Sequence, residues 1–133
     1  RTSSRKKIAK IIFSDFTKRK QLEKILHPKI IRELKKQLKL LATRHLPLAI
    51  VDVPLLFEVH LEKMFDKIIV VYCKENQQIS RLMKRDNITK TEANRRISSQ
   101  LPTSLKIKKA DIIINNSKTL ISTKKQVQKL KNL

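Results

Sequence analysis

Apolar and basic residues alternate at helical spacing in the first part of the chain. Ile8, Ile11 and Ile12 share one face of a helix. A serine precedes them, and either Ser3 or Ser4 is the expected N-cap. This pattern predicts a first, short amphipathic helix.

A longer apolar stripe follows over residues 22–41, with lysines on the opposite face. The pair His27–Pro28 interrupts it. Proline is tolerated in the first turn of a helix, where its missing N–H is harmless, so a new helix is expected to begin there. Pro47 is expected to stop this helical region.

Three short apolar runs, at residues 48–51, 68–72 and 112–114, are continuous and rich in β-branched residues. Strands that are buried on both faces of a parallel sheet have this composition. The sequence therefore predicts three parallel strands.

Helical segments separate or follow these strands, at about 75–86, 91–99 and 120–131. Thr89 and Glu92 have the spacing of a capping box. The most mobile loop is expected at residues 101–109. Strands that alternate with helices predict an α/β layered domain.

Composition narrows the class of protein. The chain has 32 Lys and Arg against 11 Asp and Glu, a formal net charge of +21. Such a charge attracts polyanions without identifying them. No apolar run approaches the ~20 residues of a membrane helix. The single cysteine, Cys73, excludes an internal disulfide and favours a reducing compartment, so a cytoplasmic location is expected.

The chain contains no glycine, although average usage of about 7% predicts roughly nine. A P-loop or a dinucleotide-binding fingerprint is therefore excluded within these residues. The first residue is Arg1 rather than Met. Both observations lead us to expect that the chain starts partway through a longer protein.

Polar residues follow each predicted strand, where open parallel sheets bind their ligands. Asp52 follows the first strand, at the position where nucleoside triphosphatases place an acid that holds magnesium, often through water. The residue equally suits a cap of the turn at Pro54. Asn115 and Asn116 follow the last strand.

Four arginines, Arg81, Arg85, Arg95 and Arg96, lie in two consecutive helical segments. Guanidinium groups bind phosphates bidentately and neutralise a phosphoryl group in transfer. Basic residues on helices more often face solvent, and by residue type alone that interpretation is favoured. His27 has no metal-like spacing with other ligands, and by itself is more readily a helix N-cap.

The chain resembles the dephospho-CoA kinase family over nearly its whole length. The matching segments stand in the family's order. They are RKKIAKIIF (5–13), LEKILHPKI (22–30), IVDVPLLFE (50–58), KIIVVY (67–72), RLMKRD (81–86), EANRRISSQ (92–100) and KIKKADIIINN (106–116).

The resemblance implies a P-loop nucleotide-kinase-like fold: three layers, a parallel sheet, a helical substrate subdomain and a lid, here truncated at the N-terminus. It implies one partial kinase domain over 1–133. Within it, residues 1–46 are the helical substrate-binding part and 47–80 the core strands; 81–109 are the lid region and 110–133 the last core strand and helix.

The resemblance also implies the site residues. Arg81, Arg85 and Arg96 match lid residues that stabilise phosphates, and Gln100 and Asn116 match positions near ATP. The substrate dephospho-CoA would meet His27, Pro54, Leu55, Leu56, Phe57 and Glu58. For Mg²⁺, the candidate remains Asp52, whose position after the first predicted strand suits an acid that holds the ion through water.

The implied reaction is ATP-dependent phosphorylation of the ribose 3′-hydroxyl of dephospho-CoA, the last step of coenzyme A synthesis. The family's P-loop and catalytic base lie before the matched region, so the chain alone is expected to be inactive. Lys118 also stands where the family usually has glycine.

Two alternatives remain at this stage. A basic nucleic-acid-binding module would explain the charge, but the basic residues lie on several helix faces and aromatic residues are few, which disfavours it. A degenerate, non-catalytic relative would explain the absence of glycine. No membrane partner is expected.

Overall fold

The computed structural model describes residues 2–44, 46 and 48–132. The chain separates into two compact units, Arg1–Pro54 and Leu55–Leu133. Within the described residues, no helix has both the length and the apolar character needed to cross a membrane.

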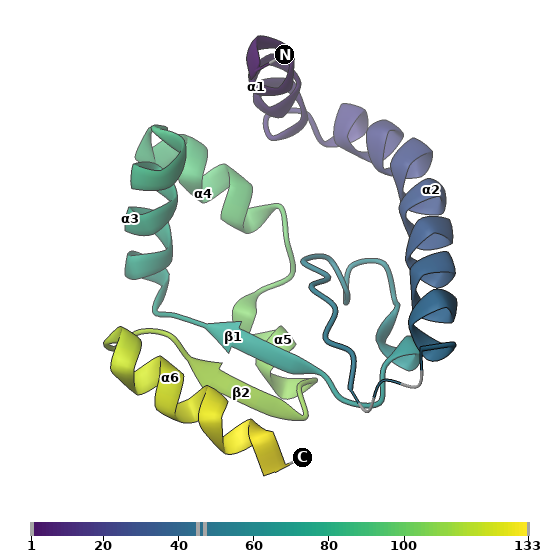
Figure 1. Cartoon of the computed structure of the whole chain (residues 1–133). Helices are drawn as coiled ribbons and strands as arrows, with labels where there is room; N and C mark the ends of the chain where they lie inside the picture. The colour runs from purple at the N-terminus through teal and green to yellow at the C-terminus, as the bar shows by residue number, and fades with distance from the viewer. Residues whose placement is uncertain (1, 45, 47, 133) are drawn as a thin grey trace. The chain divides into compact units, whose positions relative to one another are not determined.

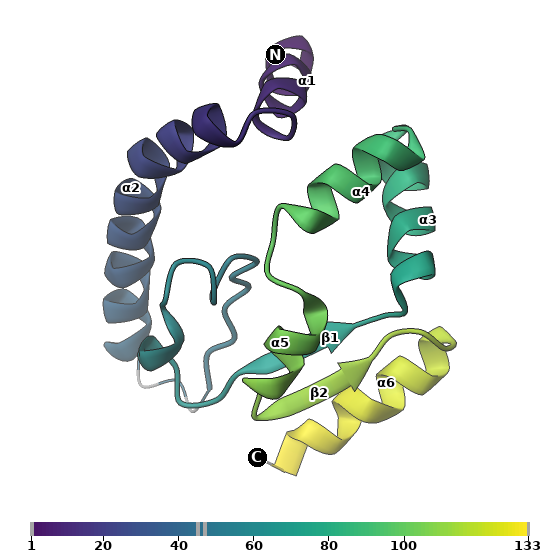
Figure 2. The same ribbon diagram turned by 180° about the vertical axis from the view of Figure 1, so that it is seen from behind.

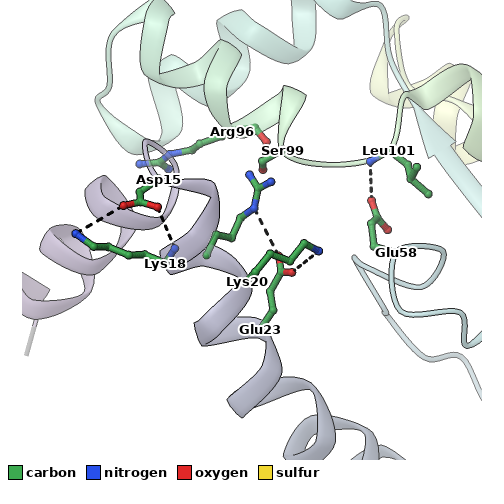
Figure 3. A network of polar contacts seen from close by, with 9 residues as sticks. Asp15, Lys18, Lys20, Glu23, Glu58, Arg96, Ser99 and Leu101 are labelled. Atoms are coloured by element: carbon green, nitrogen blue, oxygen red, sulfur yellow. Dashed lines mark hydrogen bonds and ion pairs between the residues drawn. The ribbon is translucent and has the colours of Figure 1, made fainter.

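The first unit contains helices α1 (Thr2–Ile12) and α2 (Phe16–Ala42), which contact each other. The expected serine cap of α1 is wrong, because Ser3 and Ser4 lie inside the helix. The second helix, α2, does have a side-chain cap: Asp15 Oδ1 accepts the backbone N–H of Lys18 at 3.0 Å (Figure 3). This bond satisfies one of the N–H groups that a helix start leaves unpaired.

Helix α2 runs through Pro28 without a break, so the predicted new helix at this residue is wrong (Figure 1). Proline removes one backbone hydrogen bond and costs roughly 3 kcal/mol inside a helix. The flanking residues are mostly leucine, isoleucine, lysine, glutamine and glutamate, and many of these are strong helix formers. Their summed preference over 27 residues outweighs one interrupted bond. The helix ends at Ala42, and Pro47, its expected stop, lies outside the described residues.

The strand predicted at residues 48–51 is wrong, because this segment has no regular secondary structure. Leu48 is 71% exposed and Ile50 is 81% exposed. An apolar run becomes a buried strand only where a neighbouring strand pairs with it. No strand in the described part of the chain does so.

The second unit is built on a parallel sheet of β1 (Ile69–Tyr72) and β2 (Ile112–Asn115), two of the three predicted strands. Ile69 pairs with Ile112, and Tyr72 with Asn115. This arrangement confirms the predicted α/β class with a parallel sheet.

Buried apolar side chains form a small core around the sheet. Val70 and Ile114 are the inward-facing residues of β1 and β2, with exposures of 9% and 5%. Helix α5 (Thr103–Lys108) contacts β1, and α6 (Leu120–Gln128) contacts β2 (Figure 2). Helix α5 occupies most of the segment that was predicted to be a mobile loop. Pro102 precedes it and sets an extended entry, and the helix then packs on the sheet.

Helices α3 (Glu75–Asp86) and α4 (Lys90–Ser98) form a hairpin between β1 and α5 (Figure 1). Asn87 ends α3 in the left-handed conformation, at φ 50°, where asparagine replaces the usual glycine. Thr89 and Glu92 form the predicted capping box at the start of α4. Two 3₁₀ helices, η1 (Glu62–Met64) and η2 (Lys129–Asn132), complete the unit.

Candidate functional site

Two of the predicted lid arginines meet on one carboxylate. Asp86 ends α3, and its Oδ1 accepts Arg85 Nε at 2.8 Å, while Oδ2 accepts Arg85 Nη2 at 3.2 Å. Arg96, on α4, donates through Nη1 to the same Oδ2. We call these three residues the Asp86 cluster. The cluster brings together the positive charges of Arg85, near the end of α3, and Arg96, on α4.

The charges in the Asp86 cluster shift the protonation of both partners. The hydrogen bond from Arg85, supported by the charges of Arg85 and Arg96, lowers the pKa of Asp86 despite partial burial. The same hydrogen bond raises the pKa of Arg85. The Asp86 carboxylate is therefore ionised at neutral pH, and the cluster carries a net charge of +1. Three of the five N–H donors of Arg85 remain outside its bonds to Asp86.

Arg81 lies on α3 like Arg85 but contacts a different part of the unit. Its Nη1 donates to the backbone carbonyl oxygen of Asn116 at 3.0 Å. Asn116 follows β2, and its own N–H donates to the carbonyl oxygen of Tyr72, which ends β1. Arg81 and Asn116, for which the family resemblance implies phosphate and nucleotide binding, are thus direct neighbours.

Helix α3 also holds the residue after Asn116. The backbone N–H of Lys74 donates to Ser117 Oγ, and Gln77 Nε2 donates to the Ser117 carbonyl oxygen, each at 3.0 Å. The other amide atom, Gln77 Oε1, is buried and has no hydrogen-bond partner among the described residues. The turn after β2 is therefore fixed by two side chains of α3, Gln77 and Arg81, and by the backbone of its N-cap residue Lys74.

Helix α6 holds the same turn from its other side. Gln126 pairs with both backbone groups of Asn115: its Oε1 accepts the N–H at 2.9 Å and its Nε2 donates to the carbonyl at 3.0 Å. Thr123 Oγ1 donates to Asn116 Oδ1 at 3.0 Å. Asn116 is thus oriented through both its side chain and its backbone.

Glu58 is the centre of a second polar group. Its Oε1 accepts the N–H of Leu101 at 3.0 Å (Figure 3) and lies 2.7 Å from Lys106 Nζ. Lys106 Nζ also donates to Gln100 Oε1 at 3.2 Å. Glu58 and Gln100, assigned to dephospho-CoA and ATP respectively, therefore share one lysine. We call Glu58, Gln100 and Lys106 the Glu58 cluster.

The environment of Glu58 favours its charged form. Burial acts to raise the pKa, but the hydrogen bonds from Lys106 and Leu101 outweigh it, so the pKa lies below its ordinary value. Glu58 Oε2 is buried and has no hydrogen-bond partner in the described part of the chain.

The neighbouring apolar residues differ in exposure. Phe57 is 4% exposed and belongs to the core, and Lys109 Nζ lies 5.6 Å from the centre of its ring, within cation–π range. Leu55 and Leu56 are half-buried. Phe57 therefore anchors this segment, whereas the two leucines present part of their surface.

The remaining predicted residues lie in the first unit. His27 is half-buried in the middle of α2, so it is not the N-cap that its residue type favoured. Asp52 is exposed, and it follows an irregular segment rather than a buried strand. Pro54 is exposed as well. Among the described residues, no three His, Cys, Asp or Glu side chains gather closely enough to hold a metal ion.

Sequence reasoning did not assign a role to Asp86 or Lys106. Asp86 stands in the RLMKRD segment, beside Arg85, and a carboxylate next to two expected phosphate-binding arginines was a usable signal. Lys106 comes from α5, far along the chain from Glu58, and no local pattern indicates their pairing.

Comparisons with known proteins identify the family of the chain. The family model described as dephospho-CoA kinase matches residues 2–122. A dephospho-CoA kinase of Listeria monocytogenes is 44% identical over 126 residues, which are 95% of this chain and 63% of that protein. One of Bacillus anthracis is 40% identical over 124 residues, 93% of this chain and 62% of that protein.

Solved structures give the same result. A dephospho-CoA kinase from Campylobacter jejuni superposes with a TM-score of 0.62 at 30% identity, covering 96% of this chain and 63% of that one. The mixed α/β architecture with its parallel sheet is that of a P-loop kinase-like fold. Within this class, the chain belongs to the dephospho-CoA kinase family. It spans less than two thirds of the length of the curated relatives it matches.

Proposed function

We propose that the protein carrying this chain transfers the γ-phosphoryl group of ATP to the ribose 3′-hydroxyl of dephospho-CoA. Membership of the dephospho-CoA kinase family over residues 2–122 is the observation that carries this proposal. The Asp86 cluster and the ordered turn at Asn116 support it, because phosphoryl transfer depends on positioning and on charge neutralisation.

Arg85 and Arg96 are proposed to meet the phosphates of ATP. Both belong to one hairpin, and their guanidinium groups share one carboxylate, so they reach a triphosphate together. Arg81 would assist from the same helix, while Asn116 and Gln100 would contact the nucleotide. A guanidinium contributes most where negative charge develops in the transition state.

Dephospho-CoA is proposed to bind His27 and the segment Pro54–Glu58. The support is the family pattern of these residues, together with the partly exposed Leu55 and Leu56. An adenosine-containing thiol substrate offers both hydroxyl groups and apolar surface to such residues.

Magnesium is proposed to accompany ATP. This ion keeps several waters and is bound by one or two carboxylates together with substrate phosphates. Asp52 fits that limited requirement, since its exposed carboxylate can hold the ion through water. When bound, Mg²⁺ neutralises charge on the β- and γ-phosphates. The lone Cys73 supports a cytoplasmic location.

The deciding experiment supplies the full-length protein with ATP, Mg²⁺ and dephospho-CoA, and follows coenzyme A by mass spectrometry. Formation of coenzyme A that depends on both substrates is expected. No product from a folded, full-length protein would overturn the proposal. In that case, tight and strongly salt-dependent oligonucleotide binding would favour the nucleic-acid-binding alternative.

A further inference from the structure

We propose that Asp86 is a positioning residue that holds Arg85 and Arg96 side by side before a polyphosphate arrives. The inference rests on the proposed function, since it concerns how the same site receives its substrate. The observation that carries it is the shared carboxylate: both guanidinium groups donate to Asp86, one from α3 and one from α4.

The two arginines need a partner to stay together. Like charges repel, and each arginine side chain has about 2 kcal/mol of rotamer entropy to lose when it is fixed. Asp86 opposes both effects through a two-point contact with Arg85 and a further bond from Arg96. Arg96 and Asp86 are each 24% exposed at their side chains, so solvent screens this pair less than the Arg85 contact, where the arginine is 74% exposed.

The position of Asp86 argues against a purely local role in the helix. It is the last residue of α3, where the helix dipole disfavours negative charge. The charge of the Asp86 carboxylate therefore destabilises α3 taken by itself, and the positive charges of the two arginines offset this effect. Because Arg96 is on α4, this compensation also ties the two helices of the hairpin to each other.

The consequence for binding has a definite sign. If Asp86 does not position the arginines, its negative charge weakens phosphate binding, and its removal would tighten binding. If Asp86 is a positioning residue, its removal takes away the carboxylate that both guanidinium groups share, and the ligand must then bring the two arginines together against their mutual repulsion. Ordering a side chain opposes association, so removal weakens binding even though the protein becomes more positive.

The test is calorimetric titration of the full-length protein with inorganic tripolyphosphate, which carries the phosphate chemistry without a base or ribose. Asp86→Ala is expected to raise the Kd about fivefold to tenfold, as the ordering of one or two side chains implies. Asp86→Asn, which keeps the size of the side chain, is expected to lie between Asp86→Ala and the unaltered protein. Far-UV circular dichroism verifies that each variant folds.

Glu75→Gln is the matched control, because it removes the same charge from the first turn of the same helix. It is expected to leave the Kd unchanged or to lower it slightly. In an Arg96→Ala background, Asp86→Ala is expected to have a smaller effect, since one of the groups it positions is gone.

Tighter or unchanged binding in both Asp86 variants would overturn the inference, and so would an unaltered protein that does not bind tripolyphosphate. If Asp86→Ala does not fold, the change in Kd of Asp86→Asn is the test: a higher Kd supports the inference, and an equal or lower Kd overturns it. The outcome is separable from the proposed function: a protein with the expected Kd pattern that forms no coenzyme A contradicts the kinase assignment alone.

Discussion

Arg81 and Asn116 are joined by a hydrogen bond of 3.0 Å, in which the guanidinium donates to the backbone carbonyl oxygen of the asparagine. Arg81 lies one helical turn before Arg85 on α3. One helix therefore carries a phosphate-binding candidate and also fixes the turn after β2. The two ends of the proposed nucleotide site are connected through α3.

Arg81→Ala is expected to weaken this connection. Loss of one charge-assisted hydrogen bond at an exposed site predicts a destabilisation of at most about 1 kcal/mol and a higher KM for ATP. Thermal melting and steady-state kinetics of the full-length protein measure the two effects. Lys84→Ala, on the same helix, is the control and is expected to leave both unchanged. An unaltered KM for ATP in Arg81→Ala would contradict the proposed coupling.

Arg85→Ala or Arg96→Ala is expected to reduce kcat far more than it disturbs folding. The reason is that a phosphate-binding arginine acts mainly where charge develops in the transition state. A loss of roughly 100-fold, about 2.7 kcal/mol, is what removal of one such donor produces.

The same Lys84→Ala variant serves as the control for the lid arginines, because it removes a positive charge next to Arg85 from a residue outside the Asp86 cluster. Equal and small effects of Arg85→Ala, Arg96→Ala and Lys84→Ala on kcat would mean that these arginines are solvated surface. The phosphate assignment would then be wrong.

Local patterns predicted the elements whose stabilising contacts lie close in sequence. The limits of α3 and the capping box of α4 followed from helical spacing and from Thr89 and Glu92. Pro28 was misinterpreted because one unfavourable residue was given more weight than the long helix around it. The segment 48–51 was misinterpreted because apolar composition indicates burial, whereas a strand also needs a pairing partner.

The candidate site could likewise be predicted only in part. The arginines were identifiable as phosphate-binding candidates from the family resemblance, because residue type alone favours a solvent-facing position on the helices. Their arrangement was not, since Arg96 reaches Asp86 across a turn and Lys106 reaches Glu58 from a distant helix. Such contacts depend on tertiary packing, for which a single sequence contains no direct signal.

Thr89→Ala tests the capping box. The hydroxyl of Thr89 accepts the backbone N–H of Glu92, and the Glu92 carboxylate accepts the N–H of Thr89. Removal of an N-cap side chain destabilises by about 1 kcal/mol. Chemical denaturation is expected to show this loss for Thr89→Ala and little change for Thr91→Ala, which alters an exposed threonine in the first turn of the same helix. Equal stability of the two variants would refute the cap's contribution.

Glu58 predicts a pH dependence of stability. Its pKa in the folded state lies below the ordinary value of 4.5, because the bonds from Lys106 and Leu101 outweigh burial. The folded state therefore favours the carboxylate. This contribution is fully present above pH 4.5 and is lost as the pH falls through the lower pKa of the folded state.

Glu58→Gln removes that contribution while keeping an acceptor for the Leu101 N–H. The variant is expected to be less stable at neutral pH, with a shallower loss of stability below pH 4.5. Denaturant titrations across this range measure both quantities. Glu75→Gln is the comparison, and identical pH profiles for the two variants would show that Glu58 has no special role.

Pro28→Ala tests the continuity of α2. Because Pro28 stands in the interior of the helix, its replacement restores a backbone donor and removes a steric clash with the preceding turn. Stability and ellipticity at 222 nm are expected to rise, with an upper limit of about 3 kcal/mol. If Pro28 instead opened a new helix, alanine would loosen that start, and stability would stay the same or fall. Lys29→Ala controls for the helix preference of alanine itself, since Lys29 is an exposed neighbour whose backbone donor is already present. A gain in Pro28→Ala well above that in Lys29→Ala is the expected result.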